Sequence, residues 1–390
     1  MAEEYIEWIK LPHDLQAKFF QEAEREAERI IKRINDVQEE LNKLRPLLEK
    51  NFRRLGKPRE AEIVSAIDSS RSPVLSERLG IRYGVFATAR LKIRGLERLG
   101  EEYEVGLFKR RQAFSRDKSK AFFSLLATYA ERKMAVEALD DSDLVLVDGS
   151  FYGFIYRALE MKKQGLYGDE ERKVLEETFR LTNKLVESGK ALGVIKRSRS
   201  RIIGGWLVLK GEYSNPYTMT LDKLILAHLM PAGSLLNYGD LTGYRHPPLF
   251  YTALSRAASL TQRRERDLLR EALDRVYQPF KSFNLPTSSF DSLSRLQVKP
   301  FPYVPPCEIE YPRRISLSRV EEWLSQENFF NETTGLPTAI DLVDNLVNIP
   351  SRFTEEFVAE VEARVIEKLE GKNIEMIQLF FEFLNPQKPY

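Results

Sequence analysis

The chain has 390 residues, 43% of them hydrophobic and 30% charged, and a formal net charge of only +2. This is the composition of a folded globular protein, with room for two or three domains or one large elaborated one, and it excludes a polycation that binds nucleic acid through its overall charge. The single cysteine, Cys307, excludes an internal disulfide and a zinc site built from several cysteines.

The N-terminus is acidic and lacks the apolar segment of a signal peptide. No run approaches the length of apolar residues that spans a membrane, so we expect no membrane partner. Together with the low cysteine content, this predicts a cytoplasmic protein. The abundance of Glu, Lys and Arg favours a hot-living source.

Residues 15–48 predict one long amphipathic helix. Apolar residues recur at spacings of three and four from Phe20 to Leu48, with charged residues between them, and Pro46 should end or bend the helix near its last turn. The pattern fits a coiled coil through which two copies associate. It fits equally a long helix that packs on its own domain.

An alternation of strands and helices follows. The first, second and third strands are predicted at 61–67, 82–93 and 103–114, a helix at 118–139, and a fourth strand at 143–147. Helices at 151–163 and 169–189 lead to a fifth strand at 191–195. Three strands that can pair as a meander, followed by α/β alternation, predict an α/β fold with an RNase H-like core, a mixed sheet with flanking helices. In that fold the first and fourth strands lie side by side.

The domain organisation follows from this order. We expect an N-terminal helical region at 1–55, a nuclease-like core made of 60–210 and 296–350, a helical elaboration at 211–295, and a C-terminal helix and tail at 351–390.

Two strands end in the same short pattern of an acid followed by small residues. Asp68 follows the first strand in Ile67-Asp68-Ser69-Ser70, and Asp148 follows the fourth in Val147-Asp148-Gly149-Ser150. An Asp at a strand end is often a turn former or a helix cap. Two such acids on neighbouring strands instead predict a Mg²⁺ or Mn²⁺ site, because these ions prefer carboxylate oxygens. Two-ion sites of this kind hydrolyse phosphodiesters.

Further candidates come from separate elements. Glu131 lies on the helix before the fourth strand, from which it can point an acid at the site. Lys196 ends the fifth strand, where an ammonium can hold a scissile phosphate. The basic side chains after it, Arg197, Arg199 and Arg201, suit a DNA backbone, although such a run is also a common solvated surface.

These segments resemble the NurA nuclease family of archaea and bacteria. The similarity rests on the segments around Asp68, Glu131, Asp148 and Lys196, on Glu308-Ile309-Glu310-Tyr311-Pro312, and on the stretch from Gly335 to Asp344. Leu336 stands where the family usually has an aromatic residue. By this resemblance Asp344 is the fourth acidic ligand, with Asp341 as the alternative one turn away.

The resemblance implies a homodimeric nuclease that uses Mn²⁺, or Mg²⁺, as two ions held by Asp68, Glu131, Asp148 and Asp344, with Lys196 on the phosphate. It implies 5′→3′ degradation of single- and double-stranded DNA and internal cutting of single strands. It also implies a partnership with the hexameric HerA translocase, an ATPase, in resecting DNA ends for recombination and double-strand break repair.

Two other functions are compatible with the sequence. A nucleotide-binding ATPase or sugar kinase can share the core fold but needs a second glycine-rich phosphate loop, for which Gly204-Gly205 is the best candidate. A non-catalytic adaptor of a DNA translocase would use the long helix and the aromatic residues near the C-terminus to dock its partner.

Overall fold

The computed structural model describes residues 11–111, 116–212, 215–260, 265–350, 352–370 and 372–384. The chain divides into two compact units, Met1–Asn51 and Phe52–Tyr390. The predicted domain boundaries stay predictions, and the last residues of the expected tail lie outside the described residues.

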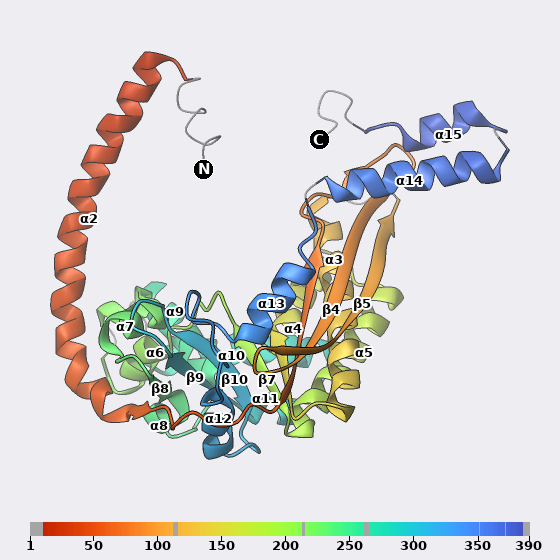
Figure 1. Cartoon of the computed structure of the whole chain (residues 1–390). Helices are drawn as coiled ribbons and strands as arrows, with labels where there is room; N and C mark the ends of the chain where they lie inside the picture. Colours follow the sequence, from red (N-terminus) through yellow and green to blue (C-terminus); the bar gives the residue numbers. More distant parts are fainter. Residues whose placement is uncertain are drawn as a thin grey trace. The chain divides into compact units, whose positions relative to one another are not determined.

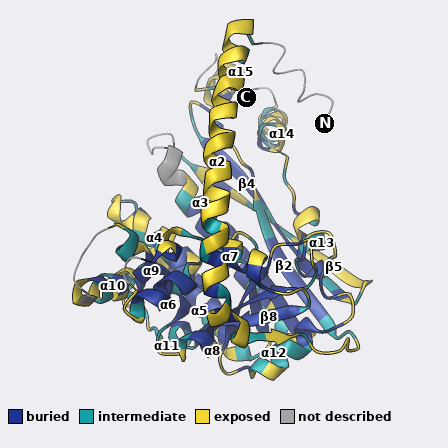
Figure 2. Cartoon of the chain, turned by 90° about the vertical axis from the view of Figure 1, so that its left-hand side faces the viewer, coloured by how far each residue is buried: buried dark blue, intermediate teal, exposed yellow. Residues whose placement is uncertain are grey.

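Helix α2 (His13–Leu48) makes up most of the described part of the first unit, and the 3₁₀ turn Glu49–Asn51 follows it (Figure 1). The helix includes Pro46 in its last turn and ends two residues later, since a proline removes one donor of the helical ladder. Most of α2 is exposed (Figure 2). Its exposed apolar residues include Phe20, Ile30 and Ile34 of the predicted seam.

The second unit is built on one mixed sheet. Its strands in the order of the sheet are β1 (Phe52–Arg54), β8 (Ser234–Asn237), β9 (Leu293–Lys299), β10 (Cys307–Pro312), β7 (Ala191–Ile195), β6 (Leu144–Asp148), β2 (Ile63–Arg71), β4 (Arg82–Arg94) and β3 (Ser76–Glu77), with β5 (Glu97–Arg110) also paired to β4. The pairs β2–β6 and β6–β7 are parallel, and the other pairs are antiparallel. The predicted first and fourth strands, β2 and β6, are therefore neighbours.

Helices cover both faces of this sheet, and further helices pack on them. The helices of this unit are α3 (Arg116–Glu137), α4 (Gly153–Lys163), α5 (Asp169–Ser188), α6 (Ile202–Leu209), α7 (Asp222–Leu229), α8 (Tyr238–Thr242), α9 (Pro248–Leu260), α10 (Glu265–Phe283), α11 (Ser288–Asp291), α12 (Leu317–Leu324), α13 (Thr338–Leu346), α14 (Phe353–Lys368) and α15 (Ile374–Phe381). Both α3 and α13 pack on β2, but on opposite faces, since Ser69 contacts α3 whereas Val64 lies beside α13, and residues an odd number apart point to opposite sides of a strand. None of the described helices has the length and apolar character of a membrane span.

The structure differs from the predicted elements in several places. Strand β5 begins at Glu97 rather than at residue 103, and residues 112–114 of the predicted third strand lie outside the described residues. Strand β2 does not end before Asp68 but continues to Arg71, because the antiparallel partner β4 holds its polar end through the pair Arg71–Phe86. The stretch 211–295, expected to be helical, also supplies strand β8 and the start of β9. The buried run of β8 has only four residues, too short for hydrophobic periodicity to distinguish a strand from a helix.

Candidate active site

Strands β6 and β7 end, and β2 leaves its parallel pairing with β6, at one point of the sheet. The parallel pairing aligns Ile67 of β2 with Val147 of β6, so Asp68 and Asp148 are the next residues along each strand. Strand β7 continues the parallel set and leads into Lys196. The crevice outside the carboxyl ends of parallel strands is where open α/β sheets bind ligands.

Lys196 joins the acids into one cluster. Its Nζ lies 3.3 Å from a carboxylate oxygen of Asp68, 3.3 Å from one of Asp148 and 2.9 Å from one of Asp344. Asp344 reaches the cluster from α13, and it also shares a hydrogen bond with Asp68. The alternative acid, Asp341, instead accepts a hydrogen bond from the hydroxyl of Thr334. The structure thus brings Asp344, and not Asp341, to the lysine.

Glu131 approaches from the other face of the sheet. It lies on α3, is only 6% exposed, accepts a hydrogen bond of 3.0 Å from the Ser69 hydroxyl, and forms an ion pair with Arg132. Its charge raises the pKa of Asp68, and the charge of Asp148 in turn raises the pKa of Glu131. The structure therefore places all five predicted site residues in one region, although only Asp68, Asp148 and Asp344 touch Lys196 directly.

Burial dominates the electrostatics of these acids. It raises the pKa of Asp68 to about 8, with a further contribution from the Asp148 charge and a partial offset by Lys196. Burial also raises the pKa of Asp148, against the lowering effect of Lys196, and the pKa of Glu131, against that of Arg132. For Lys196 burial acts to lower the pKa, but the carboxylates around it outweigh burial and raise it.

This donor set fits a divalent cation. When all four carboxylates are ionised, they outnumber the cations Lys196 and Arg132 by two charges. Within the described residues no three Asp, Glu, His or Cys side chains are already arranged around a common metal position. The lysine ammonium lies among three of the carboxylates. The carboxylates of Asp68, Asp148, Glu131 and Asp344 would supply hard oxygen ligands, which suit Mg²⁺ or Mn²⁺.

The predicted DNA-binding arginines follow Lys196 but differ in their surroundings. Arg197 and Arg199 are exposed. Arg201 is half-buried, and its guanidinium donates to the carbonyl of Thr218, 3.2 Å away. Contact of these residues with DNA stays a prediction.

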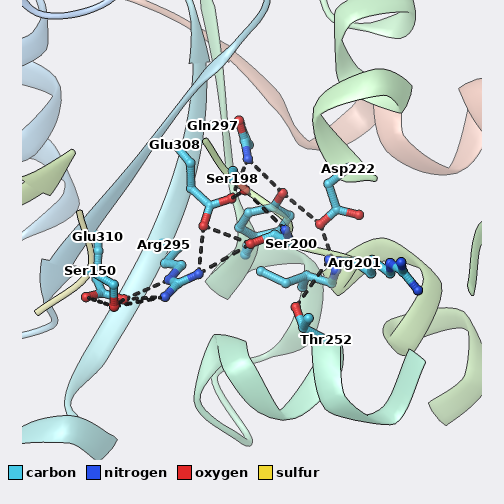
Figure 3. Close-up of polar contacts among 12 residues, drawn as sticks. Ser150, Ser198, Ser200, Arg201, Asp222, Thr252, Arg295, Gln297, Glu308 and Glu310 are labelled. Atoms are coloured by element: carbon cyan, nitrogen blue, oxygen red, sulfur yellow. Dashed lines mark hydrogen bonds and ion pairs between the residues drawn. The ribbon is translucent and has the colours of Figure 1, made fainter. Parts of the chain in front are cut away.

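Sequence reasoning missed a buried ion triad beside the site. Arg295 of β9 forms ion pairs of 2.8 Å with Glu308 and 2.7 Å with Glu310, both on β10 (Figure 3). Both glutamates are almost fully buried. The alternation of residues 308 and 310 along a strand was the available signal, since two acids on one face of an apolar strand require a buried partner.

The triad holds the two loops that carry the site. Glu310 accepts hydrogen bonds from the Ser150 hydroxyl and the Phe151 amide, in the loop after Asp148. Glu308 accepts from the hydroxyls of Ser198 and Ser200, in the loop after Lys196 (Figure 3). Arg295, by binding both glutamates, couples the loop of Asp148 to the loop of Lys196. These three are positioning residues, because they act through the loops.

Comparison with known proteins identifies the family. The model of the NurA domain matches residues 62–349, which is most of the chain. The chain belongs to the NurA family.

Two solved NurA structures share this fold, and a third is also similar to the chain. The NurA nuclease from Sulfolobus solfataricus is 14% identical, with a TM-score of 0.56, over 92% of this chain and 98% of that chain. A second NurA structure is 11% identical, with a TM-score of 0.50, over 92% and 99%. A third, of a NurA bound to dAMP and manganese, is 10% identical, with a TM-score of 0.48, over 84% and 93%. No curated protein matches the chain. The predicted family and the predicted RNase H-like α/β fold are both confirmed.

The ion pairs between Lys196 and the acids allow a test of the expected metal site in this NurA family member. We expect Lys196→Met to lower the melting temperature without metal at pH 8, because the carboxylates lose their cation. Saturating Mn²⁺ should then raise the melting temperature more than in the wild type, since a tenfold tighter Kd adds about 1.4 kcal/mol of linked stability. Thermal unfolding followed by circular dichroism measures both quantities.

Lys173→Met, on the exposed surface of α5, is the matched control and should behave as the wild type. A rise in melting temperature on Mn²⁺ addition that is no larger in Lys196→Met than in the wild type would contradict the placement of the metal at the lysine position.

The triad makes a separate prediction. Arg295→Met leaves two buried glutamates without a cation and should reduce the free energy of unfolding by about 3–5 kcal/mol. Adding Glu308→Gln and Glu310→Gln removes those charges, so the triple variant should be more stable than the single one. Urea unfolding measures the difference, and a triple variant that is no more stable than Arg295→Met would refute the ionic account.

Proposed function

We propose that this protein is a metal-dependent DNA nuclease. One observation supports this most directly: three carboxylates converge on Lys196 at the carboxyl ends of parallel strands, with a fourth buried acid beside them. Membership of the NurA family, which includes a solved structure described as a nuclease, supports the same reaction class.

Each residue has a proposed role. Asp68, Asp148, Glu131 and Asp344 would hold one or two Mn²⁺ or Mg²⁺ ions. When bound, such ions polarise a phosphodiester and lower the pKa of a coordinated water. Lys196 would leave the carboxylates and place its ammonium on the scissile phosphate, where negative charge develops. Because burial raises the pKa of the Asp68 carboxyl, binding of a metal ion at Asp68 would displace a proton from it.

The finer activity rests on family membership alone. We propose 5′→3′ degradation of single- and double-stranded DNA and internal cutting of single strands. The cellular role would be DNA end resection in double-strand break repair by recombination. The core would comprise residues 60–210 and 296–350, as predicted.

The candidate phosphate loop of the kinase-like alternative is part of a helix in this structure. Gly204 and Gly205 lie inside the buried helix α6, where a Cβ atom would meet the carbonyl oxygens of Tyr217 at 2.5 Å and Tyr251 at 1.9 Å. These glycines therefore serve close packing of backbone against backbone.

A nuclease assay tests the proposal. End-labelled single- and double-stranded DNA is incubated with wild-type protein and Mn²⁺, Mg²⁺ or EDTA. We expect cleavage with either metal, none with EDTA, and a loss of at least about 100-fold in Asp68→Ala and Asp148→Ala, since each removes several kcal/mol of charge stabilisation. Unchanged circular dichroism spectra exclude unfolding of the variants.

Asp344→Ala and Asp341→Ala form a matched pair one helical turn apart. The first should lose most of the activity and the second little, because only Asp344 contacts Lys196. Full activity in EDTA or in Asp148→Ala would overturn the proposed function. An inactive wild type that still binds a translocase would support the adaptor instead.

We also propose a homodimer that works with a HerA-type hexameric ATPase. The exposed apolar seam of α2 is suited to a second protein chain, and family membership supports both partners. Analytical ultracentrifugation of the full chain should give twice the 45.3 kDa monomer mass. The variant Ile30→Glu/Ile34→Glu should reduce self-association if the seam makes the dimer. A wild type that sediments as a monomer at micromolar concentration would contradict the homodimer.

A further inference from the structure

A second cavity adjoins the two loops of the candidate active site. Its volume is about 440 Å³, and its walls come from α4, α9, α10 and the loops that follow β6 and β7. Ser150, two residues after Asp148, and Arg199, three residues after Lys196, both line it. The cavity therefore shares with the proposed catalytic cluster the two loops that follow Asp148 and Lys196.

Three arginines from three different elements line this cavity. Arg199 follows β7, Arg256 lies on α9 and Arg275 lies on α10, and all three are exposed to solvent. Arg275 is paired with Glu271 at 2.6 Å. Within the described part of the chain, neither Arg199 nor Arg256 has a carboxylate partner, and Glu160 is the one acid in the cavity wall. Two guanidinium groups are thus available to an anion.

The floor of the cavity adds hydroxyl groups. Arg295 of the buried triad lines the cavity, as do Ser150 and Ser200, which donate hydrogen bonds to the triad glutamates (Figure 3). Arg295 donates to the hydroxyls of Ser150 and Ser200, each at 3.3 Å, and its charge is more than offset by Glu308 and Glu310. The positive charges that face an anion in the cavity are therefore those of Arg199 and Arg256.

The arginines also repel one another. Burial lowers the pKa of Arg256, and the nearby charges of Arg201, Arg199 and Arg275 lower it further. A cluster of like charges is stabilised when an anion binds among them, and planar guanidinium groups match the oxygens of a phosphate. The mixture of guanidinium, hydroxyl and apolar groups matches a phosphate with the sugar attached to it.

We propose that this cavity is a subsite for a phosphate of the DNA strand next to the scissile phosphate, with Arg256 as its main ligand and Arg199 as the second. This rests on the proposed nuclease function. The phosphate is a terminal monoester or an internal diester, and both present the same anionic oxygens. A strand whose scissile phosphate lies at Lys196 would continue past Ser150 and Arg199 into the cavity.

DNA binding without cleavage tests the subsite. A fluorescent single-stranded oligonucleotide, made with a 5′-phosphate or a 5′-hydroxyl, is titrated with full-length protein in EDTA at several salt concentrations. We expect Arg256→Gln to weaken binding about 3- to 10-fold and to reduce the slope of log K against log[salt] by about 0.7, the value for one phosphate contact on a single strand. Arg364→Gln, on the exposed surface of α14, is the control and should match the wild type.

The two substrates distinguish the two sources of phosphate. If the wild type prefers the 5′-phosphate and Arg256→Gln loses that preference, the subsite holds the terminal monoester. If Arg256→Gln weakens both oligonucleotides equally, it holds an internal diester. Affinity and salt slope in Arg256→Gln that equal those of the wild type would overturn the subsite. If the wild type shows no metal-dependent cleavage but Arg256→Gln still weakens DNA binding, only the nuclease proposal is overturned.

Discussion

The ionic contact of Lys196 with Asp68, Asp148 and Asp344 is the interaction on which the site depends. It joins acids from β2, β6 and α13 at one point. Burial raises the pKa of Asp68 and of Asp148, and the Lys196 ammonium offsets part of that effect, which stabilises the ionised cluster. A metal ion and the lysine would then compete for the same oxygens.

The buried triad supplies the stiffness that this contact requires. Loops are the most mobile parts of most folds. Here the loop after β6 donates a hydrogen bond to Glu310, and the loop after β7 donates one to Glu308. Arg295 fixes the distance between those glutamates and thereby the distance between the two loops. Burying three charges has a large desolvation cost. We attribute the triad to the positioning of the two loops, since apolar residues would stabilise the core without that cost.

The sequence was a good guide where hydrophobic pattern and chemistry coincide. The strand before Asp148 was identified by its continuous apolar run and the small residues after it, and the helix carrying Glu131 by its apolar face. The acids could be selected because metal chemistry needs oxygen ligands. It was a poor guide for β8, whose four residues are too short to show a period, and for Arg295, which lies between apolar residues far from any recognised motif.

The sequence by itself determined the family, the alternation of strands and helices, and the residue types of the site. Only the tertiary structure decided that Asp344 rather than Asp341 meets Lys196, that Arg201 turns inward, and that Arg199, Arg256 and Arg275 surround one cavity. The physical reason is that helical and strand periods are local properties of the chain. A contact between α13 and Lys196, the residue after β7, or between α4 and α10, depends on packing between segments far apart in sequence.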